Sequence, residues 1–160
     1  MLDMRLILMA AILVLMIMVS RCTSKKEPSG YPQDFRFRLD RTEFNYDSQS
    51  QRYNYYDKSI TVALTDDELK AIYEYARDIK YLNFPKEFKC DIDDGMTPCF
   101  TDRLEIGYDN KYKQTLNDDC CAKIEKDRPE QFNHLVRKIT DILNSKEQIK
   151  KLPKYDMIFM

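Results

Sequence analysis

The hydrophobic residues that follow position 34 recur with a period of two. Residues 34–40 read DFRFRLD, so the apolar side chains of an extended segment share one face and the arginines the other. Residues 42–47 and 52–64 are rich in β-prone residues, and the polar run 48–51 between them suits a turn. This pattern predicts strands.

The period changes to that of a helix in two places. Thr65 and Glu68 have the spacing of a capping box at the start of residues 65–82, and a second amphipathic pattern covers 129–144. The tail after 144 suits one more helical turn and a short terminal strand. The apolar stripes comprise Leu69, Ile72, Tyr73, Ala76 and Ile79 in the first helix and Phe132, Leu135, Val136, Ile139, Ile142 and Leu143 in the second.

Between the helices, residues 102–108 and 112–116 form a second hairpin pattern with a turn at 109–111. The facing pairs in this register are Tyr108 with Tyr112 and Leu104 with Leu116. The order of strands and helices predicts an α+β domain, an antiparallel sheet of about five strands with two helices packed on one face.

The N-terminal part of the chain shows neither the two-residue hydrophobic period of a strand nor the period of a helix. Residues 6–19 are fourteen consecutive apolar residues preceded by Arg5. A bilayer-spanning helix needs about 20 apolar residues, whereas the core of an export signal needs about 7–15. The run therefore predicts an export signal.

The residues at the end of this run, Val19-Ser20-Arg21-Cys22, resemble the lipobox of bacterial lipoproteins, although Arg21 stands where that family usually has a small residue. In the family the signal is cut before an invariant cysteine, which then carries lipid on its sulfur and amine. The resemblance implies that Cys22 is lipidated (with palmitate or a similar acyl chain) and holds the protein at a membrane of the cell envelope, on the outer membrane or the periplasmic face. The alternatives are an uncleaved short anchor and ordinary secretion with Cys22 as a thiol.

The chain divides into a signal peptide of residues 1–21, a flexible tether of 22–34 and a single α+β domain of 35–160. The layout of the domain also resembles small uncharacterised lipoprotein domains of Gram-negative bacteria. Loss of the signal would reduce the 26 basic and 27 acidic residues to 24 and 26, and this balance predicts no affinity for nucleic acid. Only 3 glycines are present, so we expect no glycine-rich nucleotide loop and no cofactor.

Four cysteines lie in the domain, and an even number in an exported chain favours disulfides. The hairpin register brings Cys99 opposite Cys121, and a bond between neighbours Cys120 and Cys121 would need a strained ring. We therefore predict the pairs Cys99–Cys121 and Cys90–Cys120. The exchanged pairs, Cys99–Cys120 and Cys90–Cys121, and a single Cys90–Cys99 bridge remain open. The spacings do not fit the C-x₂₋₄-C pattern of structural zinc sites.

Two further patterns have ordinary structural explanations. Residues 91–95 are acidic and end in glycine, but the glycine comes one residue too early for a calcium-binding EF-hand loop, so we expect a solvated loop. His134 lies near the margin of the second helix's apolar face with no nucleophile motif beside it, so we expect a surface or boundary position. We predict no metal site and no catalytic residue.

The tyrosines of residues 52–58 are the candidates for recognition. Tyr53 and Tyr55 would share one face of a strand, with Tyr56 on the other. Tyrosine rings can stack on sugar rings or on a partner protein; the alternative is that they cover the sheet edge or fill the core. We expect a lipid-anchored, non-enzymatic module that binds a protein, a glycan or a small ligand. The alternatives are an envelope hydrolase whose paired carboxylates meet only in the fold and a purely structural protein.

The lipid anchor can be tested by intact-mass measurement on the protein from native membranes. We expect a mature chain that begins at Cys22 and carries a diacylglycerol and an acyl chain, and we expect the variant Cys22→Ala to lose both. An uncut, unmodified chain would contradict the anchor, because the apolar run would then itself hold the protein in the membrane.

Overall fold

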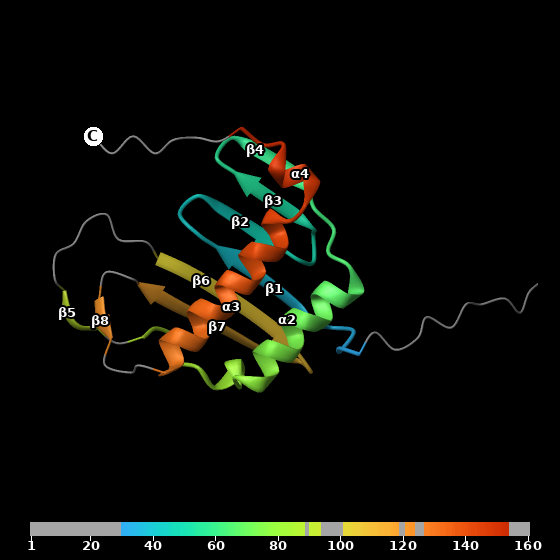
Figure 1. Ribbon diagram of the computed structural model, residues 1–160. Helices are drawn as coiled ribbons and strands as arrows, with labels where there is room; N and C mark the ends of the chain where they lie inside the picture. Colours follow the sequence, from blue (N-terminus) through green and yellow to red (C-terminus); the bar gives the residue numbers. More distant parts are fainter. Residues whose placement is uncertain (1–29, 89, 94–100, 119–120, 124–126, 154–160) are drawn as a thin grey trace, which may run out of the picture.

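The computed structural model describes residues 30–88, 90–93, 101–118, 121–123 and 127–153. Its main sheet has six antiparallel strands in the order β4-β3-β2-β1-β6-β7, and a second sheet pairs β5 with β8 (Figure 1). The strands are β1 (Arg36–Asp40), β2 (Phe44–Asp47), β3 (Arg52–Tyr55), β4 (Lys58–Thr61), β5 (Cys90–Asp93), β6 (Thr101–Tyr108), β7 (Lys111–Asp118) and β8 (Cys121–Lys123). The helices are α2 (Asp66–Asp78), the 3₁₀ turn η1 (Tyr81–Asn83), α3 (Asp127–Asn144) and α4 (Glu147–Lys150).

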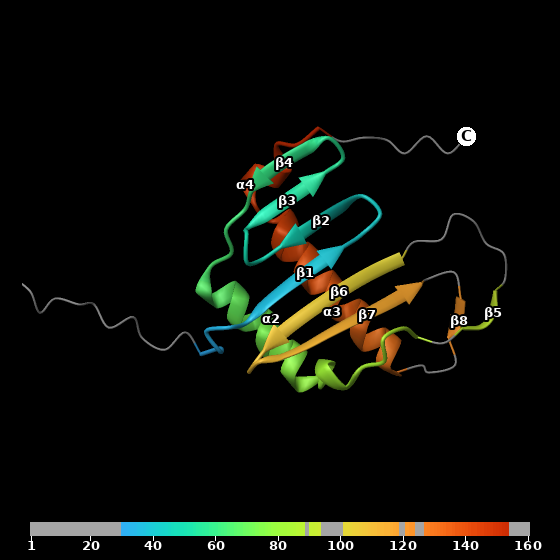
Figure 2. The ribbon, with the colours of Figure 1, turned by 180° about the vertical axis from the view of Figure 1, so that it is seen from behind.

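The predicted α+β class is confirmed. Helices α2 and α3 lie side by side on one face of the main sheet and leave the other face open (Figures 1 and 2).

Helix α3 begins at Asp127, two residues before the predicted start, because Pro129 is tolerated in a first helical turn. Helix α4 is the predicted extra turn; the predicted terminal strand falls on 154–160, outside the described residues. No helix in the described ranges is long and apolar enough to cross a membrane.

The capping box predicted for the first helix is confirmed at the start of α2. The backbone N–H of Glu68 donates to the hydroxyl of Thr65 at 3.2 Å, and the N–H of Thr65 donates to the carboxylate of Glu68 at 2.7 Å. The same carboxylate accepts a hydrogen bond from the ammonium group of Lys146 in the link between α3 and α4. Glu68 therefore joins the start of one helix to the end of the other.

The main sheet has one strand more than the predicted number because the stretch 52–64 folds back on itself. A two-residue turn at Tyr56 and Asp57 separates β3 from β4, and Tyr55 pairs with Lys58 across it. Tyr56 has a φ of 49°, a left-handed conformation in which glycine, asparagine and aspartate are the usual residues. Because a tyrosine and not one of these residues holds the left-handed position, this turn has no clear signature in the sequence.

The predicted register of the second hairpin is wrong by one residue. Tyr108 faces Lys111, and Leu104 faces Thr115, because the turn consists of the two residues 109–110 and not of three. Both of these residues have positive φ, 52° and 58°, as a type I′ turn requires. The whole of β7 is therefore displaced by one position relative to the expected pairing, so that Thr115 takes the place on the buried face that was expected for a leucine.

Residues 30–34, which the sequence analysis assigns to the tether, contact the domain. The carboxylate of Asp34 accepts hydrogen bonds from both backbone N–H groups of the turn 109–110, at 3.0 and 2.8 Å, and these bonds lower the pKa of its carboxyl group. The hydroxyl of Tyr31 donates to Asp66 at 2.9 Å. These contacts fix the point at which the chain enters the domain, beside the start of α2.

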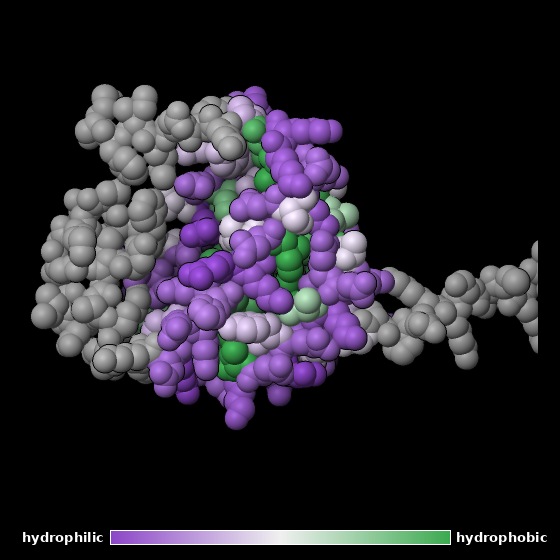
Figure 3. Space-filling model, in the orientation of Figure 1, coloured by the Kyte–Doolittle hydropathy of each residue, from purple (hydrophilic) through white to green (hydrophobic). Residues whose placement is uncertain are grey.

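One hydrophobic core lies between the main sheet and the helices. Its buried residues include Phe37, Leu39, Phe44, Tyr46, Tyr53, Leu104, Ile106 and Tyr108 from the sheet and Ile72, Tyr73, Ala76, Phe132, Leu135, Val136, Ile139 and Leu143 from the helices. The other members of the predicted stripes, Leu69, Ile79 and Ile142, are partly buried beside it. From the helix side the surface is mostly hydrophilic, with a narrow seam of hydrophobic residues (Figure 3).

Replacement of Tyr46 by phenylalanine tests how much the buried hydrogen bond of its hydroxyl group contributes to stability. The buried hydroxyl of Tyr46 donates to the carbonyl of Val62 at 2.9 Å, so Tyr46→Phe leaves that carbonyl without this donor. We expect the free energy of unfolding, measured in urea, to fall by about 1–2 kcal/mol. The matched control is Tyr112→Phe, which removes an exposed hydroxyl and should change stability by less than about 0.5 kcal/mol; equal losses in the two variants would contradict the assignment.

The carboxyl group of Glu68 should make stability depend on pH. Burial raises its pKa, but the hydrogen bonds and charge of Lys146 and the bonds from Thr65 outweigh burial, so the pKa lies below the ordinary value of 4.5. A carboxyl group with a lowered folded-state pKa stabilises the fold above its unfolded-state pKa, and loses that contribution as the pH falls through the folded-state value.

We therefore expect Glu68→Gln to be less stable than the parent by about 1 kcal/mol at pH 7, with the difference disappearing as the pH falls below 4.5. Denaturant unfolding at several pH values measures this. A difference that stays constant in acid would show that the charge of Glu68 has no such role.

Candidate functional site

The three predicted tyrosines lie at one end of the main sheet in different surroundings. Tyr53 is 3% exposed, Tyr55 is half-buried, and Tyr56 is 50% exposed in the turn after β3. Tyr53 and Tyr55 share a face, as expected, and that face is the one the helices cover. Tyr53 thus belongs to the core, as the alternative interpretation proposed, whereas Tyr55 lies at the margin of the core.

A groove of about 400 Å³ lies where this end of the sheet meets the C-terminal part of the chain. Phe44, Tyr53 and Tyr55 form its wall on the sheet side, and Ile149, Leu152 and Pro153 form the wall that α4 and the following residues supply. We call it the aromatic groove. The ring of Tyr55 therefore faces into a concave surface. Half-exposed residues of a sheet commonly lie on a flat surface and face open solvent instead.

The rings on the sheet side of the aromatic groove form a ladder. The centroids of Phe44 and Tyr53 are 5.1 Å apart with 25° between the ring planes, and those of Tyr53 and Tyr55 are 6.5 Å apart with 21°. Tyr56 meets Tyr55 edge-on at 4.8 Å. Burial raises the pKa of Tyr53 to about 12, so its phenol is neutral at pH 7. The ladder runs from Phe44 through Tyr53 to Tyr55, whose half-buried ring lines the groove.

Polar groups surround this aromatic surface. Those that line the groove belong to Arg41, Glu43, Thr140, Asn144 and Lys150. The guanidinium of Arg41 donates to the carboxylate of Asp102 at 2.7 Å, which holds it in position. The groove thus offers an aromatic surface together with amide, hydroxyl and charged groups, the combination typical of small-ligand sites.

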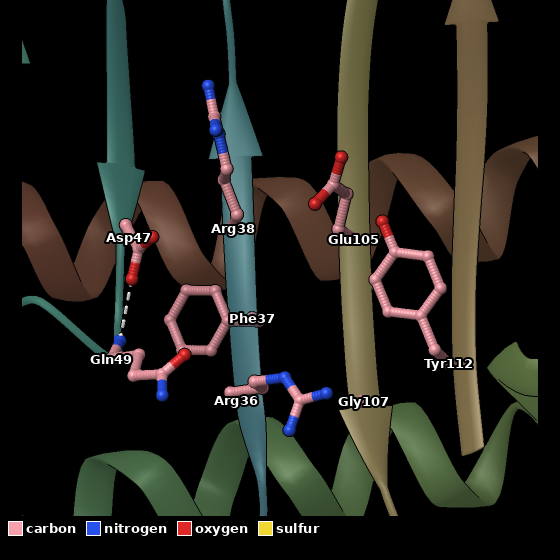
Figure 4. Close-up of a pocket in the computed structure, with 8 residues that line it drawn as sticks. All are labelled: Arg36, Phe37, Arg38, Asp47, Gln49, Glu105, Gly107 and Tyr112. Carbon is pink, nitrogen blue, oxygen red and sulfur yellow. Dashed lines mark hydrogen bonds between the residues drawn. The ribbon is translucent and has the colours of Figure 1, made fainter. Parts of the chain in front are cut away.

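The open face of the sheet carries a second concave feature, a hollow of about 150 Å³ over β1 and β6, which we call the open-face hollow (Figure 4). It is lined by Arg36, Phe37, Arg38, Asp47, Gln49, Glu105, Gly107 and Tyr112. Gly107 lies between Arg36 on β1 and Tyr112 on β7, and the guanidinium of Arg36 lies over it, 3.5 Å from where a Cβ atom would be. In Figure 4 the guanidinium of Arg36 points toward Gly107 and the hydroxyl of Tyr112 toward Glu105.

The hydrolase alternative needs two carboxyl groups that act on one bond, and the open-face hollow contains Asp47 and Glu105. Arg38 stands between them in the sheet, because it pairs with Asp47 on β2 and with Glu105 on β6. An oxygen of Asp47 also accepts hydrogen bonds from the backbone N–H groups of Gln49 and Ser50, at 2.8 and 3.0 Å. This arrangement gives no support to a hydrolytic pair at the hollow.

Outside the described residues lie Cys22, Cys99 and Cys120, together with the side chains of Cys90 and Cys121. The backbone places Cys90 on β5 and Cys121 on β8, where they face Lys123 and Asp93 respectively. They are therefore on neighbouring strands but not directly opposite. The displaced hairpin register removes the reason for setting Cys99 against Cys121, and all of the pairings remain predictions.

His134 lies on the surface of α3, as predicted, with Nε2 3.9 Å from an oxygen of Glu130. Within the described ranges, no group of three or more His, Cys, Asp or Glu side chains is placed to hold a metal ion. The predicted acidic loop is only partly described, because residues 91–93 belong to β5 and 94–95 lie outside the described residues.

No protein-family model matches the sequence, and no curated protein matches it. The residues of the two concave surfaces are therefore interpreted from their chemistry alone.

Sequence reasoning found two of the three rings of the aromatic groove and missed its second wall. It also missed the open-face hollow entirely. The available signal for the hollow was Gly107, since a glycine within a strand pattern commonly marks a bulge or a place that another group approaches closely.

Proposed function

We propose that this protein is a lipid-anchored, non-enzymatic binding module of the bacterial cell envelope, and that its aromatic groove holds a sugar ring. The observation that carries the proposal is the ladder of Phe44, Tyr53 and Tyr55, three rings that all line the groove. A flat, amphipathic ring provides the stacking surface that the apolar face of a sugar needs. The amide of Asn144, also in the groove, suits the hydroxyl groups of the sugar. The hydroxyl of Thr140 donates to the carbonyl of Val136 at 2.8 Å, so its oxygen is left to accept a hydrogen bond from the sugar.

The size of the groove favours a small ligand over a partner protein. A volume of about 400 Å³ equals that of about 13 water molecules at roughly 30 Å³ each, which suits about one sugar ring. A stable protein–protein contact buries about 800 Å² of each partner, more than a recess of this size provides. The terminal sugar of a glycan chain or a small free sugar is thus the class of ligand that fits the groove.

The position of the groove suits a protein held by its N-terminal end. Strand β1 begins at Arg36, directly after the entry point 30–34, and ends at Asp40, next to Arg41 on the groove. In Figure 1 the chain enters the domain beside α2, whereas β3 and α4 frame the aromatic groove at the far end. A domain tethered through Cys22 would therefore present the groove away from its point of attachment.

The length of the tether fits this arrangement. Residues 23–29 separate the predicted lipidated cysteine from the entry point 30–34, and seven residues span at most about 25 Å when extended. This reach would hold the domain close to the membrane surface while it leaves the far end of the sheet accessible. The lipobox resemblance at Val19–Cys22 remains the support for the anchor itself.

Calorimetric titration with cellobiose, maltose and N,N′-diacetylchitobiose tests the groove. We expect at least one of these disaccharides to bind the full chain in detergent, and we expect Tyr55→Ala to weaken that binding about fivefold or more, because stacking on an aromatic ring contributes about 1 kcal/mol.

The matched control is Tyr75→Ala. Tyr75 is also partly buried against the core, but it lies on α2 and does not line the groove, so its loss should leave sugar binding unchanged. Binding that is lost equally in both variants would indicate general destabilisation, and the absence of binding by all three disaccharides would overturn the proposed ligand class.

A further inference from the structure

A further concave surface adjoins the aromatic groove along α3. It has a volume of about 250 Å³, and we call it the polar cleft. It shares Arg41 and Thr140 with the aromatic groove, so the two surfaces meet at these residues. Its other lining residues are Asp102 on β6, Asn117 on β7, and Asn133, Val136 and Arg137 on α3.

One polar stripe of α3 runs along both surfaces. It consists of Asn133, Arg137, Thr140 and Asn144, at successive spacings of four, three and four residues, which place side chains on the same face of a helix. The first two residues line the polar cleft, the last lines the aromatic groove, and Thr140 lines both. The stripe extends about 16 Å at 1.5 Å per residue. A ligand that lies along α3 can therefore contact both surfaces at once.

Arg41 places a positive charge where the two surfaces meet. Its Cζ atom is 6.0 Å from the centroid of the Phe44 ring, which begins the aromatic ladder. Its Nε donates to the carboxylate of Asp102 at 2.7 Å, and within the described residues its two terminal nitrogen atoms donate no hydrogen bond. Since a guanidinium has five N–H donors, most of those of Arg41 remain for a ligand.

Arg137 is the second cation of the polar cleft and is exposed. In the part of the chain that the structure describes, its guanidinium forms no ion pair and donates no hydrogen bond. The one carboxylate among the described lining residues belongs to Asp102, which Arg41 already neutralises. Two guanidinium groups and one carboxylate leave the cleft with an excess of one positive charge, which favours an anionic group in it.

Hydrogen bonding in the polar cleft is also incomplete. Asn117 is 3% exposed, and its Nδ2 donates to Oδ1 of Asn133 at 2.6 Å. Its own Oδ1 has no hydrogen-bond partner among the described residues. Buried polar atoms are rarely left unpaired in folded proteins, and a sugar hydroxyl group is a donor of the kind that this oxygen lacks.

We infer that the sugar held by the aromatic groove is a uronic acid, whose ring stacks on the aromatic ladder and whose carboxylate lies in the polar cleft between Arg41 and Arg137. This inference rests on the proposed function and narrows its ligand class to acidic glycans. Carboxylates are natural partners of guanidinium groups, and such charge-assisted hydrogen bonds are stronger than neutral ones. A uronic acid carries its carboxylate directly on the ring, which suits the 6.0 Å between the Phe44 ring and the Arg41 guanidinium.

Calorimetric titration of the full chain in detergent tests the inference with cellobiose, maltose and N,N′-diacetylchitobiose and with their counterparts in which both CH₂OH groups are oxidised to carboxylates. We expect at least one acidic counterpart to bind about tenfold more tightly than its neutral parent at low ionic strength. Arg137→Gln removes one charge and keeps a polar side chain, and it should reduce this ratio to about twofold or less.

The matched control is Lys138→Gln. It removes a positive charge from the next position of α3, which lines neither the groove nor the cleft, and should leave the ratio unchanged. Circular dichroism checks the fold of each variant. Sodium sulfate is titrated as a plain anion, and Tyr55→Ala should weaken binding of the acidic sugar as it does that of the neutral one.

The possible failures separate the two proposals. A neutral disaccharide that binds, with no acidic counterpart that binds more tightly, would overturn this inference and leave the proposed function standing. A ratio that Arg137→Gln does not change would also overturn it. Sulfate that binds as tightly as the acidic sugar, with no effect of Tyr55→Ala, would identify a plain anion site instead. The absence of binding by neutral and acidic sugars alike would overturn the proposed function and this inference with it.

Discussion

The packing of α2 and α3 against one face of the six-stranded sheet is the contact on which both candidate sites depend. Apolar residues alternate with polar ones along β1 and β6, so the helices bury one face of these two strands and the other face carries their polar and charged side chains. A sheet with this pattern cannot exchange its faces, because a shift of one residue would expose the whole core. The open face is therefore fixed as a polar surface by the same sequence that makes the core.

The aromatic groove exists because the helix layer does not extend to the end of the sheet. Near the turn after β3, the rings of Phe44, Tyr53 and Tyr55 continue the core outward, and α4 with residues 151–153 forms the facing wall. The hollow on the other face has a different origin, a glycine between two long side chains. Core packing thus produces an aromatic recess on one side of the sheet, and strand pairing produces a charged recess on the other.

Features of the fold that depend on residues close together in the sequence could be predicted from the sequence. The capping box of Thr65 and Glu68 is confirmed because both partners lie within one helical turn. The hairpin register was wrong because residues 109–110 adopt positive φ without a glycine, and the sixth strand was missed for a similar reason at Tyr56. The groove brings Tyr55 to Ile149, and the hollow brings Arg36 to Gly107. Such contacts join distant parts of the chain, and no local pattern specifies them.

A backbone-amide NMR titration of the labelled protein with a disaccharide that binds tests the central claim most directly. The account predicts one localised set of shifted signals. The sugar should shift the signals of residues in the aromatic groove, such as Phe44, Tyr55 and Asn144, and should leave those of Arg36 and Gly107 on the open face unchanged. Sugar-induced shifts confined to the open face, or no shifts at all, would contradict the view that this domain is a binding module with its principal site in the aromatic groove.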